Sequence, residues 1–168
     1  PDELRAVHPL GKSPVITDGD ATVHESGAII DYLIRHHGAG RLQPPVGTPE
    51  YEDYLQWLHY AEGSAMLPLM LQMYVMRLGE AGGPLHGRIA SEIDNHMSYL
   101  DQALAGRDYL LGQALTGADI QMSFVGEVAR AFGLLPKYPN AEAWLDRLHD
   151  RPAYKAAIER GGPYALGR

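Results

Sequence analysis

Residues 11–33 have the sequence GKSPVITDGDATVHESGAIIDYL, and this stretch decides the fold of the first part of the chain. A β-branched run at 15–17 is followed by Asp18, Gly19 and Asp20, which are typical of a hairpin turn, and residues 21–24 can return as an antiparallel strand. Beyond them, apolar residues at i, i+1, i+4 and i+5 form one helical stripe: Ile29, Ile30, Leu33 and Ile34. The sequence therefore predicts a strand–turn–strand–helix unit that ends near Gly38.

The rest of the chain has a different pattern. Residues 39–49 are rich in proline and glycine and have almost no apolar periodicity, which is typical of a linker. Residues 50–79 form a long stretch that is apolar on more than one side, and helical spacing continues in four later segments, at about 85–104, 120–132, 141–149 and 153–160. The sequence predicts a fold that is α+β overall and mostly α.

Composition excludes several classes of protein. The 168 residues carry a formal charge of −7 and contain no cysteine, so disulfides, thiolate zinc sites, iron–sulfur clusters and a cysteine nucleophile are excluded within them. An acidic balance argues against nucleic acid or an anionic membrane as the main partner. No apolar run approaches the roughly 20 residues that span a bilayer, and no signal peptide opens the chain, so we expect a cytoplasmic protein.

Metal and nucleotide chemistry have little support in the sequence. Glu92 and His96 lie four residues apart, with Asp94 on another face, but a metal site needs three or four converging ligands. We therefore expect no metal. Neither a phosphate-binding glycine loop nor a serine-hydrolase motif is present.

Two local signals concern the long helices. Thr116 and Asp119 have the spacing of a shortened capping box at the start of a central helix. Pro68 lacks an N–H, so the carbonyl of Ser64 loses its helical partner and we expect a kink near Gly63 in one continuous helix. The alternative is that one helix ends there and a second begins. Methionines also recur at helical spacing along one side of this segment, and such a stripe usually packs in the core.

Four motifs in the right order carry a family resemblance. The stretch 9–14, PLGKSP, is followed by Glu25-Ser26-Gly27-Ala28-Ile29, by residues 57–64, WLHYAEGS, and by Thr116-Gly117-Ala118-Asp119. Together they resemble the cytosolic glutathione S-transferases, and residues 57–64 further resemble a bacterial and fungal subgroup of that family. The resemblance implies the second half of a thioredoxin-like glutathione-binding domain at 1–38, a β-β-α remnant, then a linker at 39–49 and an all-helical C-terminal domain at 50–168. It also implies that the first part of the thioredoxin-like domain precedes this sequence.

The resemblance assigns a glutathione site to five residues. Ser13 precedes Pro14, and in the family this proline is cis and the main chain before it pairs with the cysteinyl part of glutathione. Ser26 stands at a helix start that suits the γ-glutamyl carboxylate, while Glu25 suits the ammonium group. Lys12 could meet another carboxylate of the tripeptide. For Glu25 and Ser26 the alternative is plain helix capping.

The function implied is that of a glutathione transferase. Glutathione, the co-substrate, would be activated as a thiolate and would attack a small electrophilic, mostly apolar substrate. The same thiol could instead reduce peroxides or disulfides. The resemblance places the activating Ser, Tyr or Cys upstream, and it implies a homodimer built on the long helix and the 85–104 helix. A non-catalytic binding or assembly protein on the same fold is the alternative. Expected to line the second-substrate site are Met66, Leu69, Met70 and Tyr74.

Overall fold

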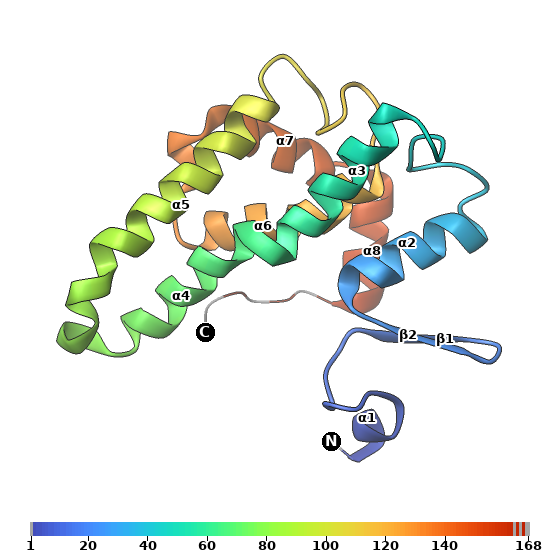
Figure 1. The fold of residues 1–168 in the computed structure, drawn as a ribbon, viewed down its shortest axis with the longest axis horizontal. Helices are drawn as coiled ribbons and strands as arrows, with labels where there is room; N and C mark the ends of the chain where they lie inside the picture. The colour runs from blue at the N-terminus through green and yellow to red at the C-terminus, as the bar shows by residue number, and fades with distance from the viewer. Residues whose placement is uncertain (1, 163, 165, 167–168) are drawn as a thin grey trace.

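A β-hairpin and a helix form the first unit of the fold in this computed structural model, which describes residues 2–162, 164 and 166 (Figure 1). Strand β1 (Val15–Asp18) pairs antiparallel with β2 (Ala21–His24), and helix α2 (Ser26–His37) follows directly. Gly19 occupies the left-handed region, at φ 55°, which lets the chain reverse between the strands. The predicted strand–turn–strand–helix unit is confirmed. A helix of only six residues, α1 (Asp2–Val7), precedes it and was not predicted, because it is too short for a periodic pattern.

The long helical stretch is continuous but distorted before Pro68. Helix α3 (Pro49–Tyr60) begins at Thr48, whose hydroxyl accepts a hydrogen bond from the Tyr51 N–H at 3.3 Å. A π-helical turn (Ala61–Ala65) then leads straight into α4 (Met66–Met76). The distortion lies one turn before Pro68, where the missing N–H and the ring of proline disturb the helix. The prediction of one continuous helix is therefore confirmed, and the expected distortion near Gly63 is a π-turn.

Four further helices complete the all-helical part: α5 (Gly83–Ala103), α6 (Gly117–Ala131), α7 (Pro139–His149) and α8 (Pro152–Gly161). Single 3₁₀ turns lie at Gly79–Gly82 and Leu135–Lys137. Helix α6 is central, since it contacts α2, α3, α4 and α7. The prediction of an α+β fold that is mostly α is confirmed.

The division into residues 1–38, 39–49 and 50–168 stays a prediction, and its outermost positions, Pro1 and 167–168, lie outside the described residues. Within the described residues, no helix is both long and apolar enough to span a membrane.

The buried side of α6 is not the side that Ile120 and Phe124 occupy. Ile120 and Phe124, which follow the four-residue spacing, are 42% and 43% exposed, whereas Met122 and Val125 are buried. Small residues explain the difference, because they let neighbouring helices approach closely. A Cβ added at Gly126 would lie only 3.1 Å from the Trp144 ring of α7. The spacing of four predicted the helix correctly but did not identify the side that faces the core.

A buried carboxylate joins three segments around the start of α6. Asp119 accepts hydrogen bonds from the N–H of Thr116 at 2.9 Å and from its hydroxyl at 3.0 Å, which confirms the predicted capping box. It also accepts from the Leu110 N–H at 2.8 Å and from Nε1 of Trp144 at 3.0 Å. Burial raises the pKa of the Asp119 carboxyl, and these hydrogen bonds act in the opposite direction. The cap therefore also fixes the preceding loop and α7.

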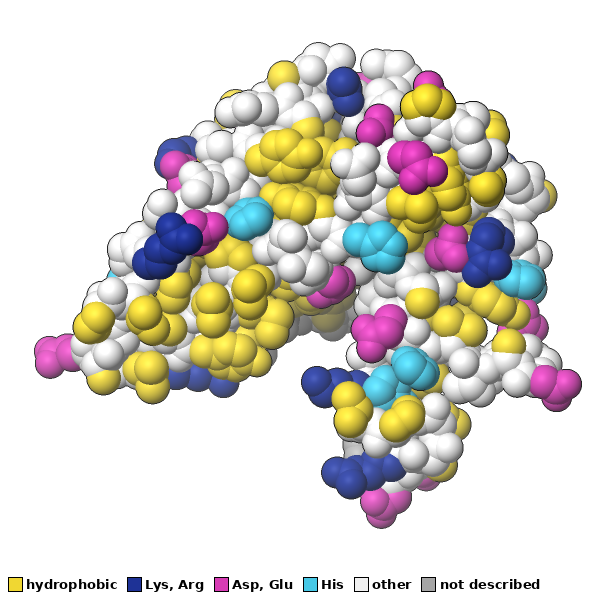
Figure 2. All heavy atoms as spheres, in the orientation of Figure 1, with side chains coloured by type: hydrophobic (Ala, Val, Ile, Leu, Met, Phe, Trp, Pro, Cys, Tyr) yellow, Lys and Arg dark blue, Asp and Glu magenta, His cyan; other side chains and the backbone are white. Residues whose placement is uncertain are grey.

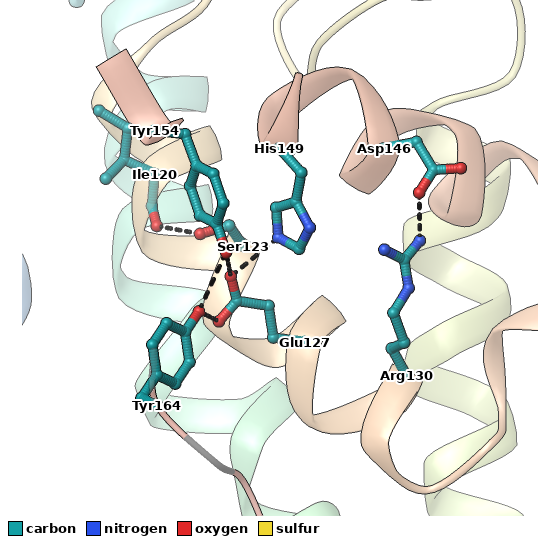
Figure 3. Close-up of polar contacts among 8 residues, drawn as sticks. All are labelled: Ile120, Ser123, Glu127, Arg130, Asp146, His149, Tyr154 and Tyr164. Atoms are coloured by element: carbon teal, nitrogen blue, oxygen red, sulfur yellow. Dashed lines mark hydrogen bonds and ion pairs between the residues drawn. The ribbon is translucent and has the colours of Figure 1, made fainter. Parts of the chain in front are cut away.

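A second carboxylate on α6 holds the C-terminal segment (Figure 3). Glu127 is 8% exposed and accepts hydrogen bonds from Nε2 of His149 at 2.9 Å, from the Tyr154 hydroxyl at 3.3 Å and from the Tyr164 hydroxyl. These three partners come from α7, α8 and the segment after α8. The last helices are thus attached to α6 through polar contacts as well as through apolar packing.

Asp119→Ala should lower the free energy of unfolding by about 3 kcal/mol or more, because it leaves several buried donors without an acceptor. Urea denaturation measures this value. The matched control is Asp150→Ala: among the described residues its exposed carboxylate pairs with Lys155 alone, and its loss should change stability by no more than about 1 kcal/mol. Equal stabilities of the two variants would contradict the assigned role of Asp119.

Candidate functional site

A cleft of about 830 Å³ opens between the N-terminal unit and the helical part. In Figure 2 the hollow between the small lower lobe and the larger body marks the junction of the two parts. One wall comes from the segment before β1 and from the start of α2, and the other comes from α3, the π-turn and α6. The cleft therefore exists only where the two parts of the chain meet.

All five residues that the sequence assigned to glutathione line this cleft: Lys12, Ser13, Pro14, Glu25 and Ser26. The Ser13–Pro14 peptide bond is cis, as the resemblance implied. Within the described residues, the backbone N–H and carbonyl of Ser13 take part in neither the hairpin ladder nor another backbone hydrogen bond. These groups are free to pair with an extended peptide, in the manner of a strand edge.

The start of α2 presents unpaired backbone donors to the cleft. Glu25 occupies the N-cap position, and its side chain makes no capping hydrogen bond within the described part of the chain. The first N–H bonded to Glu25 is that of Ile29, at 2.9 Å, so the N–H groups of Ser26, Gly27 and Ala28 precede the helical ladder. The alternative to a ligand role was plain helix capping by Ser26. In the structure Ser26 is the first residue of α2, and Glu25 holds the N-cap position instead. Free donors and the helix dipole favour an anion here.

Glu25 has a backbone conformation that L-residues rarely adopt. Its φ is 74° and its ψ is 123°, which is the left-handed half of the map and costs of order 1–3 kcal/mol for a residue with a side chain. The strained position is the junction of β2 and α2, on the wall of the cleft. Such strain persists at positions where the surrounding structure requires it, and these positions are often ligand sites.

The charges of the cleft are unevenly paired. Asp31 forms an ion pair with Arg35, with Oδ2 and Nε 2.7 Å apart. By contrast, among the described residues no lysine or arginine lies within ion-pair distance of Glu25 or Glu62. Lys12 supplies the cationic side chain of the lining. The cleft thus offers both an anion-binding helix start and carboxylates without a cation.

A group of metal-ligand type lies at one end of the cleft. Ligand atoms of His8, His24 and Glu25 are all within 4.8 Å of one another. However, Nδ1 of the buried His8 accepts a hydrogen bond from the Leu10 N–H at 3.0 Å, which leaves the ring proton on Nε2. Neither nitrogen of this ring then has a free lone pair for a metal. His8 is better suited to donate a hydrogen bond, and the prediction that no metal binds stays a prediction.

The residues expected for a second substrate do not line this cleft. Met66 and Leu69 are packed in the core, at 4% and 1% exposed, because their side of α4 faces the other helices. Met70 and Tyr74 are exposed on α4. Contact with a substrate stays a prediction for Met70 and Tyr74. At Met66 and Leu69, burial leaves little side-chain surface for such a contact.

The helical part supplies lining residues that sequence reasoning missed. His59 and Glu62 come from the end of α3 and from the π-turn, and the buried Gln121 comes from α6. The available signal was the predicted distortion before Pro68, because π-turns are frequent at functional sites. The sequence placed the distortion correctly but could not show which side chains it would turn toward the first wall.

The two walls are held together by a close approach of α2 to the start of α6. A Cβ added at Gly117 would lie 2.6 Å from Cδ1 of Ile34, 2.8 Å from Cγ2 of Ile30 and 3.0 Å from the Tyr54 hydroxyl. The Gly117 N–H also donates to the carbonyl of Leu42 at 2.8 Å. A side chain at position 117 cannot fit unless the side chains of Ile30 and Ile34 move.

Comparison with known proteins gives consistent matches over the two parts of the chain. Residues 1–45 match the family model for the glutathione S-transferase N-terminal domain, and residues 85–152 match the model for its C-terminal domain. Glutathione S-transferase 3 of Schizosaccharomyces pombe is 31% identical over 95% of this chain and 72% of its own length.

Solved structures agree with these sequence matches. A glutathione S-transferase from Actinobacillus pleuropneumoniae has a TM-score of 0.85 and 31% identity, covering 95% of this chain and 74% of its own. A sphingomonad glutathione S-transferase solved in complex with glutathione has a TM-score of 0.77 and 27% identity, covering 95% of this chain and 79% of its own.

Gly117→Ala should destabilise the protein by about 1–3 kcal/mol, because the added methyl group overpacks the contact between α2 and α6. Thermal or urea denaturation measures the loss. Gly87→Ala is the matched control: it lies inside α5 with open space around its Cβ position, so alanine should leave stability unchanged or raise it by up to about 1 kcal/mol. Equal stabilities of the two variants would contradict the close packing of α2 against Gly117.

Proposed function

This chain belongs to the glutathione S-transferase family, and we propose that it binds glutathione in the cleft between its two parts and transfers the thiolate to an electrophilic apolar substrate. The observation that carries the proposal is the convergence of Lys12, Ser13, Pro14, Glu25 and Ser26 on one cleft. Those residues lie in two segments that ten intervening residues separate in the sequence.

The proposed binding mode follows the polarity of each wall. The γ-glutamyl carboxylate accepts hydrogen bonds from the Ser26 hydroxyl and from the free N–H groups at the start of α2. The ammonium group of the same residue lies against the Glu25 carboxylate, and the main chain of Ser13 pairs with the cysteinyl peptide group. Lys12 binds a further carboxylate of the tripeptide. Each charged group of glutathione then has a partner of opposite charge or a donor.

The chemistry proposed is nucleophilic attack by sulfur. A thiolate forms a bond to the electrophilic carbon of the second substrate, and the electron pair of the broken bond leaves with the leaving group or moves onto an acceptor atom. Hydrogen bonding and positive potential near the sulfur lower the pKa of a thiol and so raise its thiolate fraction. The same bound thiol also suits reduction of peroxides or disulfides, and the group that activates the thiol is not assigned.

A double substitution that removes the proposed partners of both the γ-glutamyl carboxylate and the ammonium group tests glutathione binding. In the protein at its full natural length, Glu25→Ala combined with Ser26→Ala should weaken glutathione binding at least a hundredfold, because both ends of the γ-glutamyl group lose their partner. Titration calorimetry measures the dissociation constant. Ser91→Ala, on the exposed side of α5, is the control and should bind like the unchanged protein.

Unaltered affinity in the double variant would overturn the proposed site. Turnover assays with an electrophilic aromatic substrate, a peroxide and a mixed disulfide then separate the three reactions. Glutathione binding without turnover of any of them would instead favour the non-catalytic binding or assembly role. A cytoplasmic location belongs to the same proposal.

The proposal includes a homodimer. Exposed apolar side chains gather over α4 and the start of α5, at the lower left of Figure 2. An apolar surface of this kind favours a self-complementary two-fold interface. The exposed side chains from this region that support it are Leu67, Leu71, Met76, Leu78 and Leu85.

Leu71→Glu should convert the dimer into a monomer, because it buries a charge without a partner in an apolar interface. Size-exclusion chromatography with light scattering measures the mass. Ala156→Glu, which adds the same charge to the exposed side of α8, should leave the mass unchanged. A monomeric unchanged protein, or a dimeric Leu71→Glu variant, would contradict this interface.

A further inference from the structure

The π-helical turn brings a carboxylate from the helical part to the glutathione cleft. Glu62 and Gly63 belong to the turn Ala61–Ala65, and both line the cleft. A π-turn inserts one extra residue into an α-helix and so rotates the residues around it relative to the next turn. Glu62 and Glu25 therefore line the same cleft, although the two residues lie on different parts of the fold.

A buried amide fixes the position of this carboxylate. Nε2 of Gln121 donates a hydrogen bond to Oε1 of Glu62 at 3.2 Å, from α6 to the π-turn. Gln121 is 4% exposed and sits among the apolar residues of the buried side of α6. A buried amide that is not hydrogen-bonded costs stability, so the contact with Glu62 satisfies Gln121 and at the same time restricts the Glu62 side chain.

Glu62 and Glu25 carry like charges in the lining of one cleft. Burial, and then the charge of Glu25, raise the pKa of the Glu62 carboxyl. No lysine or arginine of the described chain lies within ion-pair distance of either group. The titratable groups that also line this cleft are His8, Lys12, Asp31, Tyr51 and His59, and of these Asp31 already pairs with Arg35. Two carboxylates in this arrangement favour a bound cation.

We propose that Glu62 is a second ligand of the glutathione ammonium group, which lies between the Glu25 and Glu62 carboxylates, and that Gln121 is a positioning residue for Glu62. This inference rests on the proposed function, since it names the residue of the helical part that completes the same site. An ammonium group has three N–H donors, so it can bind both carboxylates at once. The pair then makes the site specific for a peptide with a free γ-glutamyl amino group.

Comparison of glutathione with its deaminated analogue, glutaryl-cysteinylglycine, tests the proposal directly. The two peptides differ in the ammonium group alone. In the protein at its full natural length, at pH 7.5, Glu62→Gln should raise the dissociation constant of glutathione about tenfold or more and change that of the analogue less than twofold. Both constants come from titration calorimetry on the same preparation, so a fraction of unfolded protein affects them equally.

Glu52→Gln is the matched control. It removes the same charge from an exposed position on α3 that does not line the cleft, and both dissociation constants should stay within twofold of those of the unchanged protein. Equal effects of Glu62→Gln on the two peptides, or no effect on either, would overturn the role of Glu62. Failure of the unchanged protein to bind glutathione would overturn the proposed function itself, and this inference with it.

A double-mutant comparison tests the positioning role of Gln121. Gln121→Leu should weaken glutathione binding about threefold to tenfold and spare the analogue, because it releases the Glu62 side chain without removing its charge. In the Glu62→Gln background the same change should add less than twofold. Full additivity of the two changes would overturn the assignment of Gln121 as a residue that acts through Glu62.

Discussion

The cleft depends on the contact between α2 and the start of α6. Gly117 allows this contact, because a side chain there would overlap Ile30 and Ile34 of α2. Its N–H also holds the loop between α2 and α3 through the carbonyl of Leu42. The first wall of the cleft is attached to the second wall at this point, so the geometry of the cleft follows from a packing constraint that lies outside it.

The cap at Asp119 supports the same contact from the other side. Its carboxylate holds the N–H of Thr116, immediately before Gly117, and the indole of Trp144 on α7. A single buried group thus determines where α6 begins and where it lies against α7. With this start fixed, Gln121 reaches the π-turn and Glu62 reaches the cleft, so core packing and ligand chemistry share one helix.

Much of the fold was predictable because its signals are local. Hairpin turn residues, the stripe of α2 and the cap at Thr116 each depend on neighbours within a few residues, and each was confirmed. The side of α6 that faces the core was not predictable, because small residues rather than Ile120 and Phe124 meet the neighbouring helices. How closely two helices approach depends on the shapes of both surfaces. The spacing of apolar residues along one helix does not carry this information.

By itself, the sequence determined the strand–turn–strand–helix unit, the helical remainder and the residues of the first wall, since each follows from short-range backbone preferences or from motifs within one segment. Only the tertiary structure decided that Glu62 and Gln121 line the same cleft as Glu25, and that Met66 and Leu69 lie in the core. The physical reason is that these relations join segments tens of residues apart, and they depend on how a π-turn and a helix–helix contact orient the side chains in space.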